Sequence, residues 1–106
     1  MIKRPERIKI ISKRFNIKYV PEGTEGLPES DSGQCDSLNQ QILIQDDLKY
    51  DTQKETLLHE VFHAVSTEML AVELTEEQVL GMAKGILAVL MDNPTFARFL
   101  LKKETC

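Results

Sequence analysis

The stretch His59-Glu60-Val61-Phe62-His63 contains both histidines of this 106-residue chain and is the part best suited to chemistry. Side chains four residues apart lie on one face of an α-helix, so two imidazoles at this spacing can hold one zinc ion. The glutamate between them would lie close enough to take a proton from a water molecule at the metal. The motif therefore predicts zinc ligands at His59 and His63, with Glu60 as the general base of a peptide hydrolase.

A simpler interpretation is that the two histidines are core residues satisfied by hydrogen bonds, in a small α+β protein that binds no metal. Five-residue patterns also arise by chance. A glutamate buried between two histidines would nevertheless be unfavourable without an opposite charge, which a metal ion supplies. We therefore favour the metal site.

A catalytic zinc ion commonly has three protein ligands and one water, and this chain has no third histidine. Ser66 and Met69 stand where an extended zinc-binding motif would have Gly and His. The third ligand is therefore expected to be an acid from the next helix. Glu76 shares a helical stripe with apolar residues and should face inward, which favours it over Glu77. Cys35 is a less favoured thiolate ligand.

The motif must lie on a helix, and its flanks predict one over residues 52–70. This segment contains neither Gly nor Pro, and its apolar residues recur at helical spacing. Thr52 and Glu55 have the spacing of a capping box, which predicts that the helix begins there. Because apolar residues occupy most of its girth, we expect a central, largely buried helix whose histidine face lines a cleft.

Alternating apolar and polar residues predict strands before this helix. Residues 7–20 are expected to form two short strands with a turn near Ser12, Lys13 and Arg14, and residues 35–46 a second hairpin. Between them, residues 21–34 are rich in Gly, Pro, Ser and acids, which predicts a flexible loop.

Two further helices are predicted after the motif. Thr75 and Gln78 repeat the capping-box spacing, which indicates a second long helix over residues 75–92 that carries the acidic ligand. Pro94 can begin a short C-terminal helix. Its apolar side chains, Phe96, Phe99 and Leu100, are expected to fold back onto the core.

The composition indicates one small domain with a net charge of −4. Seven of the thirteen basic residues lie in the first twenty positions, but no nucleic-acid motif accompanies them, so nucleic acid is an unlikely partner. No segment predicts a membrane span or a signal peptide. Cys35 and Cys106 form no disulfide framework, so we expect a cytoplasmic protein with reduced thiols.

The motif and its flanks, Leu57-Leu58-His59-Glu60-Val61-Phe62-His63-Ala64 followed by Glu76 and Ala83, resemble the ImmA/IrrE type of metallopeptidase. The short bacteriophage and prophage versions are the most similar. They share a hairpin like Gln41-Ile42-Leu43-Ile44 and an ending like Met91-Asp92-Asn93-Pro94. The resemblance covers residues 33–100.

This resemblance implies a gluzincin-like fold in which zinc is held by His59, His63 and Glu76, with Glu60 as general base. It also implies a protein or peptide substrate, such as a regulator, because some relatives cleave a repressor. If the chain is encoded by a phage, its compartment would be the cytoplasm of a bacterial host.

Together, the sequence predicts a single zincin-like metallopeptidase domain over residues 1–106, of α+β class. A small antiparallel sheet would pack on the central motif helix, followed by the ligand-bearing helix and a short C-terminal helix. The predicted function is zinc-dependent hydrolysis of peptide bonds. The alternative is a catalytically silent, zinc-stabilised binding protein that acts on a host or phage factor. That alternative arises because Tyr19 and Tyr50 are the only tyrosines, and both are weak candidates for stabilising an oxyanion.

Overall fold

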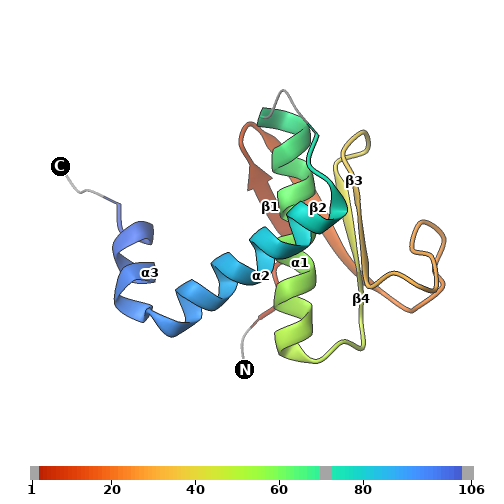
Figure 1. The fold of residues 1–106 in the computed structure, drawn as a ribbon. Helices are drawn as coiled ribbons and strands as arrows, with labels where there is room; N and C mark the ends of the chain where they lie inside the picture. Colours follow the sequence, from red (N-terminus) through yellow and green to blue (C-terminus); the bar gives the residue numbers. More distant parts are fainter. Residues whose placement is uncertain (1–2, 70–72, 104–106) are drawn as a thin grey trace.

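The computed structural model describes residues 3–69 and 73–103, and this part of the chain forms a small α+β fold (Figure 1). A four-stranded sheet packs against the first of three helices. The elements in chain order are β1 (Arg7–Ile10), β2 (Lys13–Val20), β3 (Gly33–Asp36), β4 (Gln41–Gln45), α1 (Tyr50–Met69), α2 (Glu76–Asp92) and α3 (Pro94–Leu101).

The sheet is mixed, with strand order β1-β2-β4-β3. Both predicted hairpins are confirmed as antiparallel pairs, but β2 and β4 run parallel, with Ile17 opposite Ile42. The expectation of an antiparallel sheet is therefore wrong at its centre. The reason is the long connection between β2 and β3, which carries the chain to the outer edge. After a tight turn, β4 then lies between β3 and β2.

The core lies between the sheet and α1. Phe15, Ile42 and Ile44 are fully buried on the inner face of the sheet, and Ala64 of α1 is buried against them. Alternate residues of each strand therefore face the helix, as the two-residue periodicity predicts.

The middle of the connection over residues 21–32 packs on the outer face of the sheet. Leu27 is 1% exposed, and Gly26, at φ +90°, lies against Leu43 of β4. The predicted loop is thus confirmed for these residues, whereas Gly33 and Gln34 already belong to β3. Its flexibility stays a prediction.

The start of α1 differs from the prediction, whereas the start of α2 agrees with it. The backbone N–H of Gln53 donates to the carbonyl of Lys49, so the chain is already helical before Thr52 and the expected capping box does not form there. At α2, Thr75 accepts from the backbone N–H of Gln78, and the Gln78 side chain accepts in return. Leu70, the predicted end of the first helix, and Cys106 lie outside the described residues.

The helix α1 is half-buried rather than largely buried. Among the residues of α1 whose burial the structure describes, only Glu60, Ala64 and Ser66 are buried, because the sheet covers one side and α2 crosses part of the other. Within the described residues, no helix combines the length and apolar character needed to cross a membrane.

The last helix, α3, does not fold back on the core, so that expectation is wrong. Among the described helices and strands it contacts only α2, and Phe99 and Leu100 are 77% and 55% exposed. The preceding helix, α2, has 17 residues and extends about 25 Å. Because only Asn93 separates it from α3, the short helix stays at the far end of α2, away from the sheet (Figure 1).

Candidate metal centre

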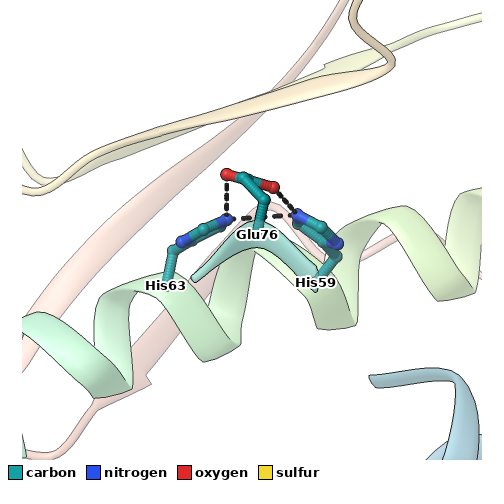
Figure 2. A group of neighbouring side chains, drawn as sticks. All are labelled: His59, His63 and Glu76. Atoms are coloured by element: carbon teal, nitrogen blue, oxygen red, sulfur yellow. Dashed lines mark hydrogen bonds and ion pairs between the residues drawn. The ribbon is translucent and has the colours of Figure 1, made fainter. Parts of the chain in front are cut away.

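His59 and His63 lie one turn apart on α1 and direct their Nε2 atoms toward the same point (Figure 2). The two Nε2 atoms are 3.1 Å apart, and the side chains are 16% and 25% exposed. The helical spacing read from the sequence therefore produces the expected pair of converging imidazoles.

Glu76, the first residue of α2, completes the group, but its side chain is 74% exposed, so the expectation that it faces inward is wrong. One carboxylate oxygen lies 3.0 Å from His59 Nε2 and the other 2.8 Å from His63 Nε2. Ligand atoms of the three residues all lie within 4.8 Å of one another, an arrangement that could hold a metal ion. Glu77, the alternative weighed from the sequence, is exposed and belongs to no such group among the described residues.

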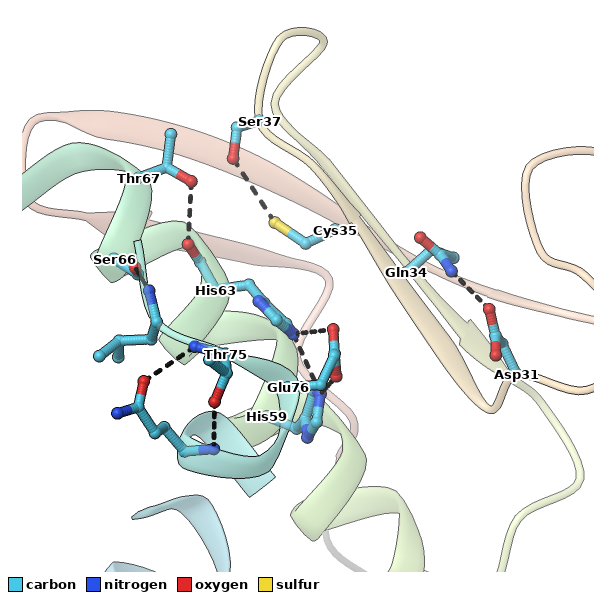
Figure 3. A network of polar contacts seen from close by, with 12 residues as sticks. Asp31, Gln34, Cys35, Ser37, His59, His63, Ser66, Thr67, Thr75 and Glu76 are labelled. Atoms are coloured by element: carbon cyan, nitrogen blue, oxygen red, sulfur yellow. Dashed lines mark hydrogen bonds and ion pairs between the residues drawn. The ribbon is translucent and has the colours of Figure 1, made fainter. Parts of the chain in front are cut away.

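Two contacts fix the start of α2 beside α1. The capping box of Thr75 and Gln78 sets the first turn of α2. The buried Ser66 of α1 accepts a hydrogen bond of 3.2 Å from the backbone N–H of Leu74, just before that turn (Figure 3). The sequence analysis missed this role of Ser66, although a single serine on the apolar side of a helix is a signal that could have identified it.

Glu60 lies beside the group and is 7% exposed. Burial, together with the nearby carboxylates of Glu76 and Asp31, raises the pKa of Glu60 to about 7. Among the described residues, no Lys or Arg forms an ion pair with Glu60. The carboxylate is therefore held in an environment that disfavours its charge and that a cation would relieve.

This environment predicts that Glu60 lowers the free energy of unfolding of the metal-free protein, by an amount that depends on pH. The pKa of Glu60 rises from 4.5 to about 7 on folding, which corresponds to about 3 kcal/mol. The folded state then binds this proton more tightly than the unfolded state, so stability falls as pH rises between these values. In chelator-treated protein, Glu60→Gln should raise the free energy of unfolding by about this amount at pH 8 and by little at pH 4.5. Urea denaturation at both pH values tests this, and an equal effect at the two would contradict it.

Gly33 of β3 forms the opposite wall against Glu60. A Cβ at Gly33 would lie 2.8 Å from Thr56 Cγ2 and 3.2 Å from both Cγ and Oε2 of Glu60. Only a glycine allows the strand to approach the carboxylate this closely. The sequence analysis missed this residue because it assigned Gly33 to the loop.

Replacing Gly33 by Ala should therefore destabilise the protein by about 1–3 kcal/mol, because Thr56 or Glu60 must move. Urea denaturation measures the change. Gly81→Ala on α2 is the matched control, since nothing lies within 4 Å of its added Cβ. In a helix that control substitution should stabilise by about 0.5–1 kcal/mol. Equal stability of the Gly33→Ala variant and the wild-type protein would show that the close approach is not needed.

The metal group lies in a cleft of about 700 Å³ between α1, the start of α2, and β3 with the loop before it. Besides Glu60 and Glu76, the cleft is lined by Asp31, Glu55 and Glu73, and its described lining contains no Lys or Arg. The Gln34 side chain donates to Asp31 at 2.6 Å (Figure 3). The walls of the cleft are therefore anionic.

Three residues weighed in the sequence analysis take no part in the group of His59, His63 and Glu76 that could hold a metal ion. Tyr19 lies under Arg4 and donates to the carbonyl of Pro5, and Tyr50 lies under Lys54 at the start of α1, so neither lines the cleft. Cys35 does line it, but its sulfur lies 3.8 Å from Ser37 Oγ and outside the ligand group. Burial raises the pKa of the Cys35 thiol, which makes it a poorer ligand.

Comparison of the chain with protein-family models, curated proteins and solved structures found no match. The resemblance to ImmA/IrrE metallopeptidases therefore stays a hypothesis that depends on the quoted residues.

Proposed function

We propose that this protein is a zinc-dependent peptide hydrolase. The proposal is supported by one observation above all, the triangle of His59, His63 and Glu76 with the buried Glu60 beside it in one cleft. Two imidazoles and a carboxylate are a donor set used by catalytic zinc. Tetrahedral donors about 2.0–2.1 Å from zinc lie roughly 3.3 Å apart, and the separations here are 2.8 to 3.1 Å.

A zinc ion held there would supply Lewis-acid chemistry, polarising the scissile carbonyl and activating a water molecule. Glu60 would accept the proton of the attacking water and pass it to the leaving amine. Glu60 is 7% exposed and lies in the same cleft as the three converging side chains, which suits a carboxylate that takes up and returns a proton there.

The edge strand β3 would be the binding site for a peptide substrate. Among the described strands it pairs only with β4, and Gly33 to Cys35 line the cleft. An extended peptide could add to this free edge as a further strand, with its scissile bond close to the metal group.

The anionic walls predict a preference for basic peptides. Peptides with Lys or Arg beside the scissile bond should be cleaved about tenfold faster at low salt than matched acidic peptides, because opposite charges speed their capture. Salt should reduce the difference. Asp31→Asn, in the cleft, should weaken the preference, whereas Glu22→Gln, outside it, should not. An unchanged preference in the Asp31→Asn variant would argue against this origin of selectivity.

The proposed function is tested by elemental analysis of untagged protein supplied with divalent salts, followed by digestion of a peptide library with and without chelator. One zinc per chain and chelator-sensitive cleavage would support the hydrolase. Protein that binds no zinc would overturn the proposal.

A second candidate is a zinc-stabilised binding protein without turnover, which would sequester a host or phage factor. It is favoured by one observation: the described lining of the cleft offers an oxyanion no Tyr, Lys, Arg or third histidine, so that the side-chain donors left for this role are neutral Ser, Thr and Gln. Zinc binding without cleavage of any peptide in the library would favour it over the hydrolase.

A further inference from the structure

The outer part of α2 together with α3 exposes most of the large apolar side chains on the surface. We call residues 80–101 the helical arm. Of the twelve large hydrophobic residues exposed in the described chain, nine belong to the arm. They are Leu80, Met82, Ile86, Val89, Met91, Phe96, Phe99, Leu100 and Leu101.

The arm exposes more large apolar side chains than the isolated ones that are normal on a protein surface. Met82, Ile86 and Val89 follow one another at i, i+4 and i+7 on one side of α2, and Leu101 of α3 is 81% exposed. Single proteins rarely expose contiguous apolar patches beyond a few hundred Å². The nine exposed side chains of the arm are therefore better explained as a surface that another molecule covers.

The charge of the arm indicates what covers it. Its 22 residues include only Lys84, Asp92 and Arg98 as charged side chains, and Lys84 already pairs with Glu55 of α1 at 3.4 Å. A surface of mixed and sparse charge does not repel a copy of itself. A nucleic acid, an acidic protein or an anionic membrane would instead call for several basic residues on the contact face.

We propose that the helical arm is a homodimer interface, in which the arm of one protomer packs against the arm of a second copy around a two-fold axis. Such an interface is isologous, so each exposed apolar side chain meets the corresponding surface of the partner. The arm extends away from the sheet, and its α3 part has no contact with a described strand (Figure 1). Two arms can therefore pair without disturbing the core.

The proposal is tested by sedimentation velocity and light scattering on purified wild-type protein over a range of micromolar concentrations. The expected mass is twice 12.1 kDa. A double variant, Phe99→Glu with Leu101→Glu, should sediment as a monomer with unchanged far-ultraviolet circular dichroism. The matched control is Leu38→Glu, which changes a 90% exposed leucine in the turn between β3 and β4 and should stay dimeric.

A second measurement keeps the test decisive if the double variant folds poorly. The thermal midpoint of a dimer rises with protein concentration, so it should do so for wild-type protein and for Leu38→Glu. Wild-type protein that is monomeric with a concentration-independent midpoint would overturn the proposal. Monomeric protein that instead co-sediments with phosphatidylglycerol vesicles would also overturn it and make a membrane the occupant of the arm.

Discussion

Replacing Glu60 by Gln is expected to abolish peptide hydrolysis while leaving the metal bound. The substitution keeps the size of the side chain but removes its ability to accept a proton, and Glu60 is not among the three converging ligands. Loss of a general base typically slows a reaction by about 10²–10⁴-fold. The measurements are kcat/KM on the best peptide from the library and the zinc stoichiometry of the same sample.

The matched control for this substitution is Glu68→Gln. Glu68 lies on the same helix, but it pairs with Lys13 of β2 at 3.1 Å and does not line the cleft. This control should retain activity. Full activity in the Glu60→Gln variant would show that the proposed base is wrong. Loss of zinc from that variant would instead place Glu60 among the ligands.

Replacing Glu76 by Ala is expected to weaken metal binding by about 100-fold or more, since even residues behind the ligands are worth 10–100-fold. Competition with a chromogenic chelator measures the affinity. Two imidazoles remain in this variant, so weak binding should persist and the helix α1 should stay folded.

The control for the ligand role is Glu77→Ala. Glu76 and Glu77 both lie in the first turn of α2, so both interact with the positive end of the helix dipole. Only Glu76 reaches the histidines. Equal losses of affinity in the two variants would therefore falsify the ligand role and reduce Glu76 to an ordinary N-terminal acid.

The two substitutions also separate the candidate functions. A hydrolase needs both Glu60 and Glu76 for activity, whereas a silent binding protein needs only the metal ligands for its stability. In the second case Glu60→Gln would have no functional effect, and Glu76→Ala would lower the thermal midpoint of the zinc-loaded protein.

Several structural predictions were correct because each depends on residues close together in the chain. The converging imidazoles follow from a four-residue spacing on a helix, and the start of α2 follows from Thr75 and Gln78. Both hairpins follow from alternation over a few residues and a short turn. The capping box at Thr52 failed although its spacing is the same, because the chain becomes helical at Tyr50 and leaves Thr52 inside the helix.

By itself, the sequence determined which groups could do chemistry and on which helices they lie, because side-chain types and helical periodicity are local properties. The tertiary structure alone decided which distant groups meet: β4 parallel to β2, Gly33 against Glu60, Ser66 holding Leu74, and the tyrosines outside the cleft. It also decided that α3 lies apart from the core. These outcomes depend on the path of a long connection and on the packing of elements far apart in the chain, and no local spacing encodes either.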